Sequence, residues 1–410
     1  MTNPIATAAQ FAAEEEVRQM WSLPQTQAAR AHVAQLWRVA HGTDVPDGLM
    51  EQFDGAMDAW VSNYLFKAAA MNGELVRNFM PPYCWQGHDV PDARMGGDNP
   101  DNCYRLAGIA PRGRYRLTGR LRPDRPAHAS FTLVENWGTS VTVQTLEMAK
   151  LEAAEDGSFT ITIDDRPANG RMNHMTSNPR VKFLFIRDSM MDWARETPLD
   201  LHIERLDSLG IARSLEERLD EALRRVREDV PLYYWFFRLS AGHAINTIPQ
   251  PVRTATFGGL VIQSTGLGRL HLKDDEAAII RFDPAGAAYN SLQTANWWYQ
   301  SIDSHRLQTG LSLAQTIPNA DNTVTTVVST QDPGIHNWVD TGGFKDLLPM
   351  IRWQGLSPEQ VREGPRLWID VVPFGQLDRY LPKDIARVDA AGREAQVEAR
   401  RAAWDRRTTA

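Results

Sequence analysis

Cysteine and long apolar runs are both scarce in this chain of 410 residues. Its two cysteines, Cys84 and Cys103, do not make a disulfide framework or a thiolate zinc site. No stretch of about 18 apolar residues occurs, so no membrane-spanning helix is expected. The N-terminal stretch MTNPIATAAQFAAEEEV lacks the basic start and the apolar run of a signal peptide. These absences predict a soluble protein of a reducing compartment, the cytoplasm.

Clustered positive charge is also missing. The formal net charge is −7, the isoelectric point lies near 5.8, and no block of basic residues occurs. Such a chain offers no positive face to nucleic acid or to an anionic membrane, so neither is expected as a partner. Apolar residues make up 42% of the sequence and charged residues 23%, as in globular proteins. The length favours two domains or one elaborated domain.

Nucleotide-binding motifs are absent. The fragments GLGRL and GGL lack the full G-x-G-x-x-G spacing and the strand–turn–helix context of a dinucleotide site. Neither a P-loop pattern nor a G-x-S-x-G nucleophile elbow occurs. We therefore expect an activity without a cofactor, although a lysine-dependent cofactor stays open.

Metal sites fit the sequence poorly. His202 and Glu204 share one face of a predicted strand, as two metal ligands would. The simpler interpretation of HIERLD is a cluster of surface salt bridges. In GDNPDN, Pro100 interrupts the alternating oxygen ligands that a calcium loop needs, and Tyr104 and Arg105 follow where an acid is wanted. We expect no bound metal.

Helical periodicity dominates residues 7 to 79, where apolar side chains recur every three or four positions. Asp47 is placed to cap one of these helices, and Pro81 stops the last one. A later amphipathic helix begins at Ser214, which forms a capping box with Glu217. The aromatic segment PLYYWFFRLSAGHAIN then starts with proline, as helices often do.

Strand periodicity begins near residue 104. Short runs rich in Val, Ile, Thr and Phe are separated by Pro, Gly and Asp-Gly, and residues 155–157 (EDG) read as a hairpin turn between two of them. This predicts a mainly β fold with α additions, in which two β-rich halves resemble sandwiches or jelly rolls. The predicted regions are a helical N-terminal region (1–95), a first β-rich region (96–210), a helical connection (211–250), a second β-rich domain (251–380) and a C-terminal helix (381–410). That last helix can cover the body or a neighbouring subunit, which leaves a homo-oligomer open.

Aromatic residues gather beside polar ones in three clusters. The chain has 13 tryptophans, and most are expected in the core. The three clusters are GGDNPDNCYR (96–105), NWWYQSIDSHR (296–306) and STQDPGIHNWVD (329–340). Each lies at the end of a predicted strand, where a rigid scaffold commonly presents binding groups. The alternative for each cluster is simple turn chemistry, because Asp-Pro and Asn-Pro start turns.

Together these clusters resemble a bacterial family known only as "domain of unknown function one-two-one-four". The similar segments are GGDNPDNCYRLAGIAPRGRYRLTGR, FLFIRDSMMDWARETPLDLHIERL, NWWYQSIDSHRLQTGLSLAQT and DPGIHNWVDTGGF followed by IRW, within about residues 96–355. The resemblance implies a largely β fold of sandwich or jelly-roll character, and it implies no catalytic residues. Family members often carry a small or aliphatic residue at the position of His336. The family often occurs among catabolic genes for hydrophobic compounds.

The leading hypothesis is a cofactor-independent catabolic enzyme that acts on a hydrophobic or aromatic small molecule. The polar groups available allow dehydration or hydration, isomerisation, C–C cleavage or hydrolysis, that is, lyase, isomerase or hydrolase chemistry by proton transfer. Asp303 would orient His305 and Asp332 would orient His336 as acid or base. The expected substrate-binding residues are Asp98, Asp101, Tyr104, Arg105, Trp298, Arg306 and Trp338. The hypothesis requires the three clusters to converge in space.

Two other interpretations stay open. A non-catalytic β-sandwich could bind a carbohydrate or another ligand on tryptophan faces with Asn and Asp at their edges. A metalloenzyme with histidine ligands is the third possibility. A deep cavity around a titratable pair favours an enzyme, whereas a shallow aromatic shelf favours a binding module.

Overall fold

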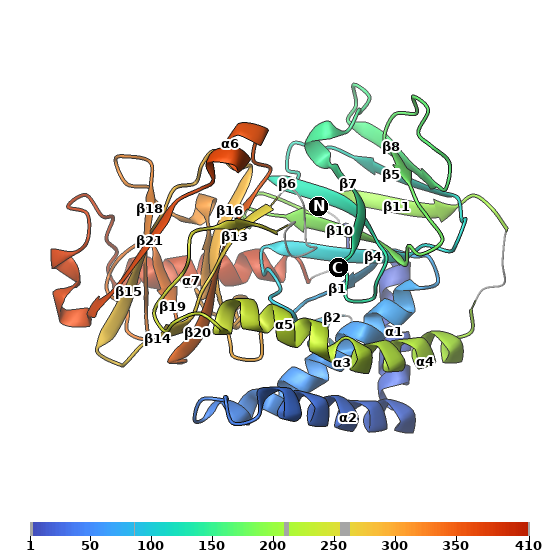
Figure 1. Cartoon of the computed structure of the whole chain (residues 1–410). Helices are drawn as coiled ribbons and strands as arrows, with labels where there is room; N and C mark the ends of the chain where they lie inside the picture. The colour runs from blue at the N-terminus through green and yellow to red at the C-terminus, as the bar shows by residue number, and fades with distance from the viewer. Residues whose placement is uncertain (1–2, 86, 209–212, 255–262, 409–410) are drawn as a thin grey trace.

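The computed structural model describes the chain except for residues 1–2, 86, 209–212, 255–262 and 409–410. It confirms a mainly β fold with helical additions: two β sandwiches lie side by side, and helices from the N-terminal region pack beneath them (Figure 1). In the described part of the chain, no helix has both the length and the apolar character needed to cross a membrane.

The N-terminal region is helical as predicted up to residue 70. It contains α1 (Ala8–Trp21), α2 (Pro24–His41), a 3-10 helix (Leu49–Gln52) and α3 (Phe53–Ala70). Residue 48, a glycine with a positive φ, precedes the 3-10 helix, so the predicted cap at Asp47 is wrong. The prediction of helix is also wrong for 76–78, which form a strand because the turn at Gly73, with φ of 94°, ends the helical course.

The first sandwich consists of two sheets. One has the strand order β1-β4-β10-β6-β7 and the other the order β11-β5-β8-β9, and side chains such as Phe131 and Ile161 fill the core between them. The predicted hairpin at EDG is wrong, because β8 pairs with β5 of the second sheet while β7 pairs with β6 of the first. The strands of this region are β1 (Val76–Asn78), β2 (Tyr83–Trp85), β3 (His88–Val90), β4 (Asn102–Gly108), β5 (Tyr115–Arg120), β6 (His128–Val134), β7 (Thr142–Glu147), β8 (Ser158–Asp164), β9 (His174–Thr176), β10 (Phe183–Ser189) and β11 (Asp200–Arg205).

The second sandwich repeats this two-sheet plan. One sheet has the order β12-β13-β20-β16-β17, with β14 also paired to β20, and the other has the order β19-β18-β15-β21. The central strand β20 contains Pro349, which lies beyond the last paired residue of β13, Leu267. The strands are β12 (Val252–Arg253), β13 (Gln263–Leu267), β14 (Leu270–His271), β15 (Glu276–Phe282), β16 (Tyr289–Ala295), β17 (Gly310–Ser312), β18 (Val324–Ser329), β19 (Trp338–Asp340), β20 (Asp346–Gln354) and β21 (Leu367–Pro373). The run FGGLVIQS (257–264), whose apolar and β-branched residues predict a strand, lies mostly outside the described residues.

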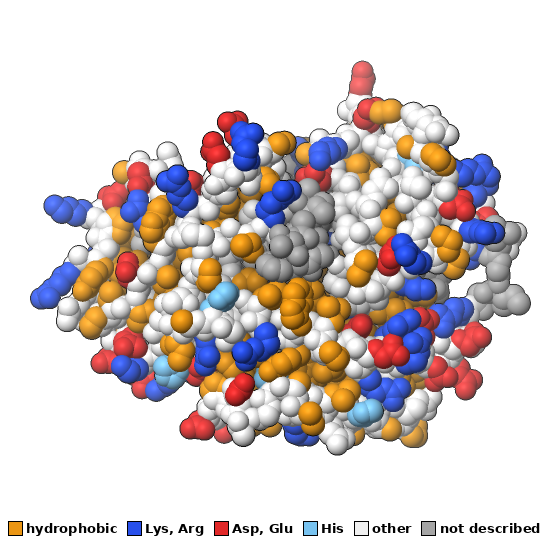
Figure 2. Space-filling view, viewed as in Figure 1, with side chains coloured by type: hydrophobic (Ala, Val, Ile, Leu, Met, Phe, Trp, Pro, Cys, Tyr) orange, Lys and Arg blue, Asp and Glu red, His pale blue; other side chains and the backbone are white. Residues whose placement is uncertain are grey.

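The described part of the chain contains four further α-helices: α4 (Leu215–Glu228), α5 (Val230–Ala241), α6 (Pro358–Glu363) and α7 (Ala390–Asp405). Short 3-10 helices also occur at Met148–Lys150, Leu313–Gln315 and Phe374–Arg379. Ser214 and Glu217 form the predicted capping box of α4. The C-terminal helix α7 packs against its own chain, where Arg393 bonds Asp332 of the second sandwich and Arg407 donates to the carbonyl of Pro100. Hydrophobic side chains gather along α5 on the face shown in Figure 2, whereas charges of both signs are scattered around them.

An aromatic cluster joins α2 and α5 to the second sandwich. The imidazole of His41 contacts the rings of Tyr234, Phe237 and Trp298 and stacks on Trp37. Neither ring nitrogen of His41 has a hydrogen-bond partner among the described residues. Burial lowers the pKa of His41 to about 4, because the charged ring would lose its hydration, and the nearby Asp44 only partly opposes this.

The stability of the fold should therefore depend on pH through His41. Between pH 6.5 and pH 4 the unfolded chain binds a proton that the folded chain does not, so the free energy of unfolding should fall as the pH falls. The share of His41 is on the order of 3 kcal/mol. We expect His41→Phe to flatten this part of the profile, measured by urea unfolding at several pH values. His32→Phe, at an exposed position of the same helix, is the control and should leave the profile unchanged.

Candidate functional site

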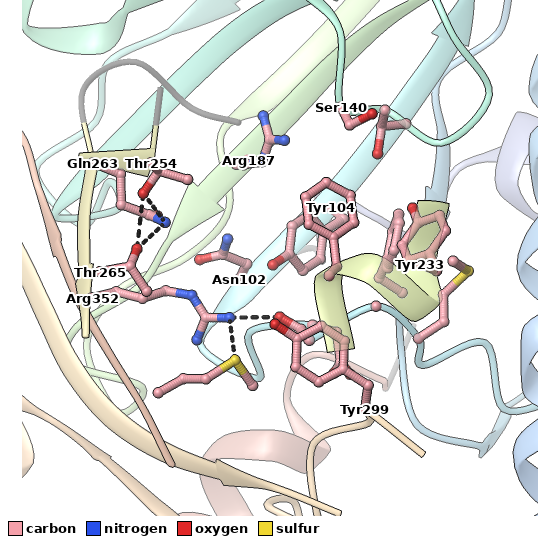
Figure 3. Close-up of a pocket in the computed structure, with 18 of the residues that line it drawn as sticks. Asn102, Tyr104, Ser140, Arg187, Tyr233, Thr254, Gln263, Thr265, Tyr299 and Arg352 are labelled. Carbon is pink, nitrogen blue, oxygen red and sulfur yellow. Dashed lines mark hydrogen bonds between the residues drawn. The ribbon is translucent and has the colours of Figure 1, made fainter. Parts of the chain in front are cut away.

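A cavity of about 190 Å³ lies where the two sandwiches meet α5 (Figure 3). Strands β4 and β10 form one wall, β13 and β20 form the opposite wall, and α5 closes one side. Segments 95–98 and 138–140, together with Phe79, Thr254 and Tyr299, complete the lining. Side chains far apart in sequence therefore surround one space between the halves.

Two arginines face this cavity from opposite sandwiches. Arg187 occupies the same face of β10 as Phe185, since alternate residues of a strand share a face, and its guanidinium lies 3.9 Å from the centre of that ring. Arg352 of β20 donates to the carbonyl of Gly97 at 2.5 Å. Within the described residues, neither arginine forms an ion pair with a carboxylate. Burial lowers the pKa of Arg187 to about 10, so its charge is partly desolvated and lacks a counter-ion.

A tyrosine hydroxyl lies beside these two cations. Tyr104 pairs directly with Arg187 across β4 and β10, and its hydroxyl accepts a hydrogen bond from the backbone N–H of Asn99 at 3.0 Å. Burial raises the pKa of the Tyr104 hydroxyl, while Arg352 and Arg187 partly oppose the rise. The phenol is therefore neutral near pH 7, and its own proton remains available for an acceptor in the cavity.

A chain of amides and hydroxyls forms the wall from the second sandwich. Gln263 donates to the hydroxyls of Thr254 and Thr265 at 3.2 and 2.9 Å (Figure 3). Gln354 donates to Gln263 at 2.7 Å and accepts from Ser189 of the first sandwich at the same distance. This wall can offer hydrogen bonds to a polar ligand group.

Aromatic rings supply the apolar part of the lining. Phe79, Tyr104 and Phe185 pack against one another, with ring centres 5.0 to 5.8 Å apart. Tyr233 and Tyr299 face them across the cavity. Rings of this kind suit a ligand with a flat or apolar body.

The backbone around the cavity is unusually constrained. Phe79, Thr139 and Tyr299 line it with positive φ angles of 52°, 52° and 60°, values that non-glycine residues seldom adopt. Such conformations cost on the order of 1–3 kcal/mol each and cluster at functional sites. Gly96 and Gly97 also have positive φ, and a Cβ at Gly96 would lie 2.3 Å from the Tyr233 ring. The glycines of GGDNPDNCYR therefore allow the loop to pass close to aromatic rings.

The acidic residues of that loop act mainly as structural anchors. Asp98 lines the cavity, but its two carboxylate oxygens accept from the backbone N–H and the hydroxyl of Ser301 at 2.9 and 2.6 Å. Burial raises the pKa of Asp98, and the bonds from Ser301 oppose this. Asp101 accepts from Tyr289 at 2.6 Å and from Trp193 at 2.8 Å. Both residues connect the first sandwich to other parts of the molecule.

Of the predicted site residues, Asp98 and Tyr104 line the cavity. Arg105 does not, because it faces the interior of the first sandwich and bonds Asp188 at 2.6 Å. Trp298 belongs to the aromatic cluster around His41 and donates to the carbonyl of Leu49. The first two clusters do meet, however, since Tyr299 and Ser301 contact the loop at 96–98.

The predicted convergence is wrong for His305. Its ring is buried beside Trp404 of α7, with ring centres 5.7 Å apart, and it does not line the cavity. Burial lowers the pKa of His305 to about 4. Asp303 bonds Arg94 at 2.9 Å rather than orienting the imidazole, and Arg306 is exposed.

The third cluster also lies elsewhere. Asp332 bonds Arg393 of α7, and Trp338 donates to Ser329. His336 bonds the neighbouring Asn337 and lines a separate hollow of about 330 Å³ beneath α7. The expectation that one site joins all three clusters is therefore wrong, because α7 and its arginines occupy the space beside the histidines. The catalytic roles of these residues remain untested predictions.

The sequence reasoning missed Arg187, Arg352, Tyr233 and Tyr299. Both arginines stand inside apolar strand runs, in FLFIRD and in MIRW. A charged residue within such a run is unusual, because unpaired charges are rarely buried. An arginine inside an apolar strand run is therefore the sequence feature that could have identified these two residues. Among the described residues, no group of three His, Cys, Asp or Glu side chains could hold a metal.

Comparisons with known proteins concern the fold. An uncharacterised protein from Burkholderia cenocepacia superposes with a TM-score of 0.69 and 25% identity, over 88% of this chain and 99% of its own. A protein from Vibrio parahaemolyticus has a TM-score of 0.44 and 11% identity, over 78% of this chain and 99% of its own. No family model and no curated protein match the chain. The resemblance to the domain-of-unknown-function family stays a prediction.

Gly96→Ala tests how closely the loop is fitted to the cavity wall. The new Cβ would meet Tyr233 at 2.3 Å, so overpacking should add about 1–3 kcal/mol to the cost of the positive φ. Gly170→Ala is the matched control, because Gly170 has φ of 82° and no atom within 4 Å of the added Cβ. Urea unfolding should show the larger loss for Gly96→Ala. Equal losses would contradict the close packing.

Proposed function

We propose that the cavity binds a small organic anion with an aromatic or apolar body, and that the protein acts on it by acid–base chemistry without a nucleotide cofactor. The observation that carries this proposal is the pair Arg187 and Arg352, which face one cavity from two sandwiches without a carboxylate partner among the described residues. A desolvated guanidinium is stabilised by a bound carboxylate, with which it can form two parallel hydrogen bonds.

The size and lining of the cavity support this class of ligand. A cavity of about 150 Å³ is enough to hold benzene, so 190 Å³ accommodates one ring with a short substituent. Phe185 and Tyr299 offer ring faces for the body of the ligand. The hydroxyls of Thr254 and Thr265 offer hydrogen bonds to a second polar group.

Tyr104 is the group best placed for proton transfer. Its oxygen accepts from the N–H of Asn99, and its own proton can be donated to a ligand oxygen held between Arg187 and Arg352. Such a donor suits dehydration, isomerisation, C–C cleavage or hydrolysis. The catalytic role therefore moves in this proposal from His305 and His336 to Tyr104.

A binding module without turnover is the second candidate. The observation that favours it is the engagement of Asp98, whose two oxygens are both bonded to Ser301 and are not available as a general base. Tyr104→Phe would separate the two functions. An enzyme would lose turnover while keeping its ligand, whereas a binding module would have no turnover to lose.

Calorimetric titration tests the anion site. We expect benzoate to bind more tightly than benzyl alcohol, because only benzoate presents a carboxylate to the arginines. Arg187→Met or Arg352→Met should weaken benzoate by roughly 10- to 150-fold, since a hydrogen bond to a charged group contributes about 1.5–3 kcal/mol. Arg195→Met, at a side chain that is 88% exposed, is the control and should leave the affinity unchanged. Equal affinities for benzoate and benzyl alcohol would refute the anion site.

A further inference from the structure

A fully buried lysine lies behind one wall of the cavity. Lys67 is on α3, its side chain is 0% exposed, and its Nζ has no hydrogen-bond partner among the described residues. Nζ lies 4.1 Å from the centre of the Tyr64 ring and 5.3 Å from the centre of the Phe79 ring. Phe79 lines the cavity, so the amine lies next to a residue of the cavity wall.

Other polar atoms beside this lysine are also unsatisfied. Asn63 is one turn earlier on α3, and its Oδ1 has no partner within the described part of the chain. Asn78 precedes Phe79 in β1, is 1% exposed, and has neither Oδ1 nor Nδ2 bonded there. Helix α3 packs against β1, so these unsatisfied polar atoms belong to two elements that are in contact. Buried polar atoms without partners are costly and call for a physical explanation.

The unpaired amine is most easily explained as a neutral one. A buried ammonium without an ion pair costs several kcal/mol, whereas a neutral amine avoids that cost. Burial lowers the pKa of Lys67 to about 7, although Asp229 opposes the shift. A neutral lysine amine in an apolar pocket is a nucleophile toward carbonyl groups.

We propose that Lys67 forms an imine with the carbonyl group of the cavity ligand, which is then an aldehyde or ketone that also bears a carboxylate. The amine adds to the carbonyl carbon, the two amine hydrogens leave with the carbonyl oxygen as water, and a C=N bond replaces the C=O bond. This inference rests on the proposed function, because Arg187 and Arg352 supply the affinity for the carboxylate. Neither the sequence motifs nor the mechanism above uses Lys67.

Phe79 is the residue that must move. Its ring centre lies 5.3 Å from Nζ of Lys67, the residue lines the cavity, and its backbone has the strained φ of 52°. Strained conformations persist only where the surrounding structure imposes them, and they cluster at active sites and switch regions. Rotation of this one ring connects the amine to the ligand space.

Reductive trapping tests the imine on the unmodified protein. The protein is incubated with 4-carboxybenzaldehyde and cyanoborohydride at pH 7, and the modified lysines are located by peptide mass mapping. At this pH only about one in 2,500 ordinary lysine amines is unprotonated. We expect Lys67 to be modified at least about tenfold more than the exposed Lys150 and Lys273. Lys67→Met should remove this adduct, Lys150→Met should not, and Phe79→Ala should accelerate it.

Trapping with benzaldehyde and binding of benzoate distinguish a failure of the imine from a failure of the anion site, on which the imine rests. Trapping of Lys67 by 4-carboxybenzaldehyde but not by benzaldehyde supports both. Equal trapping by the two aldehydes supports the imine and overturns the anion site. If benzoate binds and Lys67 stays unmodified while surface lysines react, the imine is overturned and the anion site stands. If benzoate does not bind and Lys67 stays unmodified, both are overturned.

Discussion

The arrangement of the two sandwiches depends on one buried polar seam between them. The loop at 96–102 belongs to the first sandwich, yet most of its polar groups bond the second. Ser301 donates to Asp98, Gln293 donates to the Asp98 carbonyl at 2.6 Å, and the Tyr289 hydroxyl bonds both Asn99 and Asp101. These groups are buried, so each lost partner would leave a desolvated donor or acceptor at a cost of about 1–3 kcal/mol. Hydrogen bonds are directional, whereas apolar contacts tolerate sliding. The seam therefore fixes the relative position of the halves more closely than hydrophobic contact could.

The cavity is a consequence of that seam. The carbonyl of Gly97 accepts from Arg352, and the N–H of Gly97 donates to the carbonyl of Tyr299 at 2.7 Å, so the loop holds a cation and a ring of the second sandwich opposite β4 and β10. Helix α7 reinforces the same junction, because Arg407 at its end donates to the carbonyl of Pro100 at 3.2 Å. These backbone hydrogen bonds of Gly97 fix one edge of the space that the side chains line. A site formed in this way is organised before a ligand arrives.

Local sequence patterns predicted the elements better than their partners. Period-two runs identified most strands, and the capping box at Ser214 located α4, because both signals arise within a few neighbouring residues. They could not show that β7 and β8 join different sheets, since pairing depends on contacts distant in sequence. The site illustrates the same limit. The cluster GGDNPDNCYR correctly pointed to Asp98 and Tyr104 as cavity residues. His305 and His336 were predicted at the same site only because similar residue types surround them in the sequence. The arginines that do face Tyr104 come from two separate strands, and only the fold brings them together.

The pairing of buried charges determines which chemical groups the cavity offers to a ligand. In the interior of a protein an arginine is normally paired, as Arg105 is with Asp188 in the core of the first sandwich. The guanidinium group of Arg187 lies beside an aromatic ring, and that of Arg352 bonds a carbonyl oxygen. Their positive charges can therefore still be stabilised by solvent or by an anionic ligand. Lys67 differs from them, because full burial lowers the pKa of its amine to about 7 and the neutral form is populated near neutral pH. Two charged guanidinium groups and one amine of lowered pKa form a complementary set. The cations attract a carboxylate, and the amine retains the lone pair needed to attack a carbonyl. Pairing either arginine with an internal acid would cancel the first property, and a direct ion pair to Lys67 would cancel the second.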